Sequence, residues 1–172
     1  MANNQNIFLI GLMGAGKTTI GRQLASELSL EFFDSDHEIE KRTGVTITHI
    51  FDIEGEAGFR KRETAMLDEL TEKKGIVLAT GGGAILKPEN RQFLMSRGTT
   101  IYLYANIDTL LERTSKDRNR PLLQTEDPQA KLGELLDIRD PLYRETADII
   151  IDTGKDSVRL ALKEILEKLQ AS

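Results

Sequence analysis

A glycine-rich stretch near the start of the chain reads Gly11-Leu12-Met13-Gly14-Ala15-Gly16-Lys17-Thr18. It matches the pattern G-x-x-x-x-G-K-[ST] at every required position. Glycines at this spacing let backbone N–H groups turn inward around phosphate oxygens, and the start of the following helix adds further N–H groups and positive partial charge. In such a loop the lysine reaches the β- and γ-phosphates, and the next hydroxyl contacts Mg²⁺. The stretch therefore predicts a nucleotide-binding phosphate loop (P-loop).

Short apolar runs alternate with amphipathic stretches along the rest of the chain. The runs suit strands buried on both faces, and the stretches place apolar residues at helical spacing. We expect strands at 6–10, 31–33, 76–79, 100–104 and 148–151. We expect helices at 18–30, 36–42, 55–73, 88–97, 107–116, 127–144 and 157–169, with a break near Pro141. This alternation predicts an α/β fold with a parallel sheet covered by helices on both faces.

Length and composition limit the classes of protein that are possible. A chain of 172 residues fits one domain, covering residues 1–172. The sequence contains no cysteine, which excludes disulfides and thiolate metal sites. The apolar run Ile7–Ile10 is too short for a signal peptide or a membrane span, so we expect a cytoplasmic protein without a membrane partner. A net charge of −5 gives no general attraction for nucleic acid.

Carboxylates and glycines follow two of the predicted strands. Asp34 and Asp36 flank Ser35 at the end of one strand, where one could hold Mg²⁺ through water and the other could accept or orient a hydroxyl proton. Alternatively, one or both cap the next helix. The run Gly81–Gly83 suits a ligand that touches the main chain, or a flexible turn. Strand ends of a parallel sheet share one edge, so we expect these segments to meet the P-loop.

Basic residues occur in two further segments of this acidic chain. The stretch Phe59-Arg60-Lys61-Arg62-Glu63 is either an anion-binding face or a solvated one. The predicted loop 115–126 and the helix before it carry Arg113, Lys116, Arg118 and Arg120. Such a loop could close over phosphates and stabilise transferring charge, or simply be solvated.

A second motif would point to a different class of nucleotide-binding protein. Asp52-Ile53-Glu54-Gly55 matches the D-x-x-G pattern of GTPases. Two fixed positions in four occur often by chance, and the sequence contains no Asn-Lys-x-Asp segment for guanine. We therefore favour a kinase over a GTPase.

Six ordered segments together resemble the shikimate kinase family. They are Gly11–Thr18, Asp34–Asp36, Phe59-Arg60 with Glu63, Gly81–Gly83, Arg120-Pro-Leu-Leu123 and Arg139-x-Pro-x-Tyr143. The resemblance covers about residues 6–169. It implies a three-layer P-loop kinase fold similar to nucleoside monophosphate kinases, with a five-stranded parallel sheet and helices on both faces. It also implies a substrate-binding region at about 34–63 and a mobile lid at about 114–126.

The resemblance also implies a role for individual residues. The catalytic residues would be Lys17, Asp36 and Arg120. The ATP-binding residues would be Gly14, Ala15, Gly16, Lys17, Thr18, Thr19, Arg113 and Arg120. Shikimate would be bound by Asp36, Arg60, Gly82 and Arg139. Mg²⁺ would be held by Thr18 and, through water, by Asp34.

The implied reaction transfers the γ-phosphoryl group of ATP to the 3-hydroxyl of shikimate, giving shikimate 3-phosphate and ADP. It belongs to the pathway to chorismate and the aromatic amino acids, and the expected enzyme is a monomer. One alternative is a related small-molecule kinase such as gluconate kinase, which also acts on a hydroxy acid. Another is a regulatory nucleotide-binding module without catalysis, which the complete set of expected catalytic residues disfavours.

Overall fold

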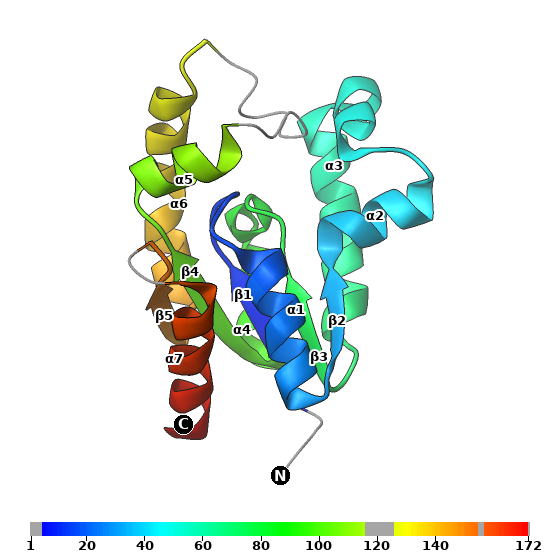
Figure 1. Ribbon diagram of the computed structural model, residues 1–172. Helices are drawn as coiled ribbons and strands as arrows, with labels where there is room; N and C mark the ends of the chain where they lie inside the picture. Colours follow the sequence, from blue (N-terminus) through cyan, green and yellow to red (C-terminus); the bar gives the residue numbers. More distant parts are fainter. Residues whose placement is uncertain (1–4, 116–125, 155–156, 172) are drawn as a thin grey trace.

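A five-stranded parallel sheet forms the centre of the computed structural model, which describes residues 5–115, 126–154 and 157–171 (Figure 1). The strands lie in the order β2-β3-β1-β4-β5. Their bounds are β1 Ile7–Ile10, β2 Glu31–Asp34, β3 Ile76–Ala79, β4 Thr99–Tyr104 and β5 Ile149–Asp152. The five predicted strands and their parallel arrangement are thus confirmed, with ends shifted by one residue at most. Because β1 is central, the loop that follows it emerges from the middle of the sheet edge.

Helices cover both faces of this sheet. Their bounds are α1 Lys17–Leu28, α2 Ser35–Thr43, α3 Ile47–Thr71, η1 Ala84–Leu86, α4 Pro88–Arg97, α5 Ile107–Thr114, α6 Pro128–Thr146 and α7 Val158–Ala171. Helices α1 and α7 contact each other on one face, and α4 packs between α3 and α6 on the other (Figure 1). Side chains of β1 and β3, together with residues 100–103 of β4, fill the space between these layers and are buried, as strands covered on both faces require. The predicted three-layer arrangement is confirmed.

The largest departure from the predicted helices lies at the start of α3. The sequence pattern indicated a helix from Gly55, but α3 begins at Ile47, where the Thr46 side chain caps it by accepting from the His49 N–H at 3.1 Å. Gly55 interrupts the helix with φ 72° and ψ 178°, a conformation that favours glycine. The kink breaks the helical period, which is why 47–54 gave no clear signal.

The predicted break at Pro141 was wrong. Helix α6 runs from Pro128 to Thr146 with Pro141 inside it. A proline removes one intrahelical hydrogen bond, but α6 is held by other means: the Asp127 side chain caps its start, and buried Leu132 and Tyr143 anchor it on either side of the proline. Tertiary packing therefore overrides the local cost.

The carboxyl ends of the strands meet at one edge of the sheet, as expected for this class of fold. Thr80, directly after β3, donates from its N–H and its hydroxyl to the carbonyl of Leu9 in β1, at 3.1 and 2.8 Å. This contact holds the glycine run after β3 beside the loop after β1. Among the described residues, no helix combines the length and apolar content needed to cross a membrane.

Asn6 stabilises the opposite edge of the sheet, and its removal tests that role. It is 2% exposed, donates to the Lys73 carbonyl at 2.6 Å, and accepts from the Ile76 N–H at 3.1 Å. We predict that Asn6→Ala lowers the free energy of unfolding by about 2–3 kcal/mol, because buried main-chain groups lose their partners. The measurement is urea denaturation followed by circular dichroism.

Gln5→Ala is the matched control for this prediction. Gln5 is exposed and makes one hydrogen bond, to the Thr99 hydroxyl at 2.7 Å. Its loss should change stability by no more than about 0.5 kcal/mol. Equal effects of the two substitutions would refute the role given to Asn6.

Candidate active site

The P-loop after β1 adopts a backbone conformation that depends on its glycines. Gly14 has φ 86° and Gly16 has φ 99°, both in the left-handed region. A Cβ atom at Gly14 would also lie 2.8 Å from the side chain of Thr114. Helix α1 starts directly after Gly16, so its first N–H groups face the loop. Lys17 lies across the same loop and donates to the carbonyls of Gly11 and Leu12 at 2.5 and 2.9 Å.

A cavity of about 290 Å³ opens over this loop. Its lining includes Gly14, Gly16, Lys17, Thr18, Thr19, Asp34, Asp36, Gly81, Gly82 and Arg113. Arg113 in α5 donates to the Gly14 carbonyl at 3.1 Å and to the Thr153 carbonyl at 2.9 Å, which ties α5 and the segment after β5 to the P-loop. Most of the predicted ATP-binding residues therefore line one cavity. Arg120 and residues 116–125 of the predicted lid lie outside the described residues.

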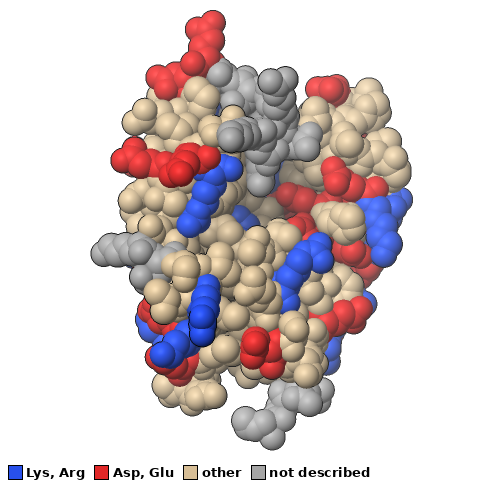
Figure 2. Space-filling model, viewed as in Figure 1, with Lys and Arg blue, Asp and Glu red and all other residues tan. Residues whose placement is uncertain are grey.

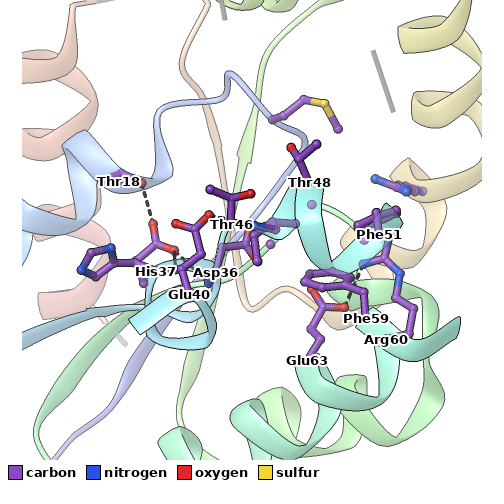
Figure 3. A pocket seen from close by; sticks show the side chains of 17 residues that line it. Thr18, Asp36, His37, Glu40, Thr46, Thr48, Phe51, Phe59, Arg60 and Glu63 are labelled. Atoms are coloured by element: carbon purple, nitrogen blue, oxygen red, sulfur yellow. Dashed lines mark hydrogen bonds and ion pairs between the residues drawn. The ribbon is translucent and has the colours of Figure 1, made fainter. Parts of the chain in front are cut away.

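Asp34 caps helix α2, which is one of the two roles that the sequence left open, and it also contacts the P-loop. Its Oδ1 accepts from the N–H groups of Asp36 and His37 at 3.0 and 3.2 Å, so it caps α2. Its Oδ2 accepts from the Thr18 hydroxyl at 2.9 Å, which places the Asp34 Oδ2 and the Thr18 Oγ1 together beside the P-loop (Figure 3). Hydroxyl and carboxylate oxygens suit Mg²⁺, which keeps several waters and needs few protein ligands. The described residues contain no cluster of three or more His, Asp or Glu side chains that could hold a metal ion.

A second, larger cavity of about 450 Å³ adjoins the first. It is lined by residues of α2, α3, α6 and the glycine run, including Asp36, Glu40, Thr46, Thr48, Phe51, Phe59, Arg60, Glu63, Gly81, Gly82, Gly83 and Arg139 (Figure 3). Thr18, Asp34 and Asp36 line both cavities. Figure 2 shows the surface hollowed on this face, with side chains of both charges around the hollow. The P-loop thus meets the segments that line the larger cavity at these shared residues.

The glycine run 81–83 lets charged side chains approach the main chain. A Cβ atom at Gly81 would lie 2.8 Å from the Asp36 Oδ1 and 2.8 Å from the Glu63 Oε2, and one at Gly83 would collide with the Arg60 guanidinium. A Cβ atom at Gly82 would lie 3.4 Å from the Arg139 Nη1. The run is therefore a turn of main chain that lies between charged side chains, which leave no space for a Cβ atom at Gly81 or Gly83.

Arg60 lies in a buried ion pair, not on a solvated face. Its Nη1 donates to the Glu63 Oε1 at 2.9 Å, and Glu56 accepts at 3.3 Å from its other nitrogens. Glu63 is fully buried, and burial raises its pKa although Arg60 opposes that shift. Burial alone would lower the pKa of Arg60, but Glu63 and then Glu56 raise it overall. By contrast, Arg62 is exposed and pairs with Glu54.

Arg139 in α6 differs from Arg60 because its charge is less well balanced. It is 2% exposed, and no group among the described residues accepts a hydrogen bond from its Nη1. Burial lowers the pKa of Arg139, and nearby Arg60 lowers it further, while Tyr143 acts in the opposite direction. Two guanidinium groups thus face one cavity beside a single fully buried carboxylate. Such a site suits an anionic ligand with a planar group, such as a carboxylate.

Several residues in or beside the larger cavity were not assigned a role from the sequence. Glu56 lies four residues before Arg60, and this helical spacing could have identified it. Phe51 packs against Phe59 in a tilted arrangement with ring centroids 5.0 Å apart, but it belongs to the helical segment that the sequence did not reveal. Tyr143 donates a hydrogen bond to the Gly82 carbonyl over 61 positions in sequence, which local patterns cannot indicate.

Comparison with known proteins gives consistent matches. The family model for shikimate kinase matches residues 13–170. A shikimate kinase from Methylococcus capsulatus is 58% identical over all of this chain and 96% of its own length. One from Thioalkalivibrio sulfidiphilus is 61% identical over 96% of this chain and 87% of its own length.

Solved structures agree with the sequence matches. A shikimate kinase from Acinetobacter baumannii, in complex with shikimate, is 55% identical with a TM-score of 0.95, covering 98% of this chain and 94% of that one. A deoxyadenosine kinase from M. mycoides shares 16% identity and a TM-score of 0.64, over 96% of this chain and 100% of its own, which shows likeness of fold alone.

The buried pair of Arg60 and Glu63 can be tested for its contribution to stability. We predict that Glu63→Gln lowers the free energy of unfolding by about 3 kcal/mol, because it leaves a buried guanidinium without its main counter-charge. Glu54→Gln is the matched control, since Glu54 pairs with Arg62 at the surface and should contribute at most about 1 kcal/mol. Chemical denaturation of both variants measures the difference. If Glu63→Gln lowered the free energy of unfolding as little as Glu54→Gln does, the buried pair of Arg60 and Glu63 would not have the assigned role in stability.

Proposed function

Because the chain belongs to the shikimate kinase family, we propose that its two adjoining cavities bind the two substrates of that reaction. ATP occupies the P-loop cavity and shikimate occupies the larger one. The γ-phosphoryl group then passes to the 3-hydroxyl of shikimate, giving shikimate 3-phosphate and ADP. The observation that carries this proposal is that Asp36 lines both cavities, at the place where donor and acceptor must meet.

The acceptor is bound, in this proposal, through its carboxylate and its hydroxyls. Arg60 and Arg139 bind the carboxylate, for which the unpartnered Nη1 of buried Arg139 is the strongest support. Gly82 contributes its main-chain N–H, since its backbone lies beside Arg139. Asp36 binds the hydroxyl groups of shikimate, and this contact directs the reacting oxygen toward the P-loop cavity.

The donor is bound by the P-loop and by residues from the far side of the cavity. Main-chain groups of Gly14, Ala15, Gly16 and Thr19 surround the phosphates, as the conformation of the loop and the start of α1 support. When ATP binds, Lys17 replaces its hydrogen bonds to the loop carbonyls with hydrogen bonds to phosphate oxygens. Arg113 binds on the adenine side, and Arg120, which lies outside the described residues, is the further cation for the phosphates.

We further propose that Mg²⁺ is held by Thr18 and, through water, by Asp34. The Thr18–Asp34 hydrogen bond brings the two oxygens together at the right place beside the P-loop. When bound there, Mg²⁺ would supply positive charge that offsets the charge of the phosphate oxygens during transfer. Asp34 already caps α2 with its other oxygen, so its orientation is fixed before any metal arrives.

The residues of the chain act mainly by positioning and by electrostatics. The 3-hydroxyl oxygen forms a bond to the γ-phosphorus while the bond from that phosphorus to the β,γ-bridging oxygen breaks, and ADP leaves. The hydroxyl proton passes to Asp36 or, when Asp36 only orients the hydroxyl, to solvent. In a loose transition state the charge lies on the transferred group, where Lys17 and Arg120 stabilise it.

We also propose a monomeric enzyme that works in the cytoplasm. The residues proposed to bind both substrates all come from this chain. A cytoplasmic location fits the use of ATP as phosphoryl donor.

A coupled ADP-release assay with shikimate and gluconate side by side tests the proposed function. We expect Mg²⁺-dependent ADP release with shikimate, and none above background with gluconate or after addition of a chelator. Release with gluconate alone would assign the larger cavity to a different hydroxy acid. Release that persists in the chelator would overturn the proposed role of Mg²⁺.

Arg139→Ala tests the proposed carboxylate contact. We predict a rise in the KM for shikimate of roughly 30- to 150-fold, the equivalent of about 2–3 kcal/mol for a lost charged hydrogen-bond partner. The KM for ATP should stay within about twofold, since Arg139 does not line the P-loop cavity. Arg62→Ala is the control of the same residue type, because Arg62 is exposed and lies outside both cavities. A rise in the KM for ATP alone would place Arg139 on the nucleotide side.

A further inference from the structure

Tyr143 connects helix α6 to the glycine run of the larger cavity. Its side chain is 1% exposed, and its hydroxyl donates to the Gly82 carbonyl at 2.5 Å. It lies one helical turn after Arg139, so both side chains project from the same face of α6. One helix face therefore supplies both a cation for the cavity and an anchor for the main chain beside it.

The ring of Tyr143 is itself held in place from behind. It stacks on Tyr102 of β4 with ring centroids 4.8 Å apart and an interplanar angle of 30°. The Tyr102 hydroxyl donates to the Asp140 Oδ1 at 2.6 Å, and Arg144 donates to the Asp140 Oδ2 at 2.8 Å. Because both carboxylate oxygens of Asp140 are engaged, the Tyr102 ring is a fixed support for Tyr143. The position of the Tyr143 hydroxyl is thus set by the core, independently of any ligand.

Gly82 lies close to Arg139, the buried cation of the larger cavity. A Cβ atom on it would lie 3.4 Å from the Arg139 Nη1 and 3.5 Å from the main-chain nitrogen of Met13 in the P-loop. Three consecutive glycines have more conformational freedom than any other tripeptide. The neighbours of Gly82 have their own anchors, since Gly81 donates to the Ser35 hydroxyl and Gly83 accepts from Leu86. Tyr143 completes this set at the central residue of the run.

We propose that Tyr143 is a positioning residue for shikimate, which acts by fixing the peptide plane between Gly82 and Gly83. The proposal rests on the proposed function of the larger cavity and adds a residue to it. A trans peptide is planar, so an anchored Gly82 carbonyl also fixes the direction of the Gly83 N–H. The glycine main chain is then preorganised as the surface against which the substrate lies, and binding does not have to order it. Burial raises the pKa of Tyr143, so its hydroxyl keeps the proton that it donates.

A purely structural hydroxyl would have a different consequence. It would satisfy a buried carbonyl, and its loss would lower stability without changing substrate affinity. A positioning hydroxyl would change the KM for shikimate and leave the KM for ATP unaltered. The two roles are therefore separable by kinetics.

The test compares Tyr143→Phe with the wild-type chain and with Tyr104→Phe. The first substitution removes the hydroxyl but retains the ring on Tyr102. We expect the KM for shikimate to rise about 5- to 20-fold, with the KM for ATP within about twofold of wild type. Tyr104→Phe deletes the same group from the end of β4, where the ring meets Tyr102 edge-on at 6.1 Å and lies outside both cavities. It should change neither constant.

Hydrogen exchange of the ligand-free protein gives a second measurement that does not depend on activity. In Tyr143→Phe, amides of residues 81–84 should exchange faster than in wild type, while those of β1 should not. An unchanged KM for shikimate, or unchanged exchange in the glycine run, would overturn the proposal. A wild-type chain without shikimate-dependent ADP release would overturn the proposed function instead, and the exchange data would then decide whether Tyr143 orders the glycine run.

Discussion

The site depends on the close approach of opposite charges to one stretch of main chain without side chains. Gly81–Gly83 passes between the carboxylates of Asp36 and Glu63 and the guanidinium groups of Arg60 and Arg139. Any Cβ atom at Gly81 or Gly83 would push these groups apart. Charges gathered in this way interact strongly because water is largely excluded from between them. The geometry of the larger cavity therefore follows from three missing side chains.

The charges around this run are not fully balanced within the protein. Arg60 has Glu63 as a buried partner and Glu56 as a second one, whereas the Arg139 Nη1 has no acceptor among the described residues. A buried cation without a full set of partners costs stability. The folding of the core provides the free energy that keeps Arg139 there, and a bound carboxylate would restore the balance. The incomplete partnering of Arg139 in the unliganded protein thus supports the proposed binding of an anion in this cavity.

Local chemistry in the sequence was enough to predict the P-loop, the five strands and the meeting of three strand ends at one edge. Each depends on residues adjacent in sequence or on the rule that parallel strands share an edge. Segment 47–54 escaped prediction because Gly55 interrupts its period and part of it faces a cavity. The continuity of α6 through Pro141 depends on packing, and the contact of Tyr143 with Gly82 spans 61 positions. Such features arise only from the tertiary fold.

The spacing of Asp34 and Asp36 shows how one short segment can serve both substrates. Asp34 ends β2 in an extended conformation, so one of its oxygens can cap α2 while the other reaches Thr18 in α1. Asp36 is in the first turn of α2, where the capped backbone directs its carboxylate toward Gly81 and both cavities. A single capping interaction therefore fixes Asp34, the proposed metal-side residue, relative to Asp36, the proposed acceptor-side residue. Phosphoryl transfer needs that alignment, because a loose transition state gains most from groups that are already in place.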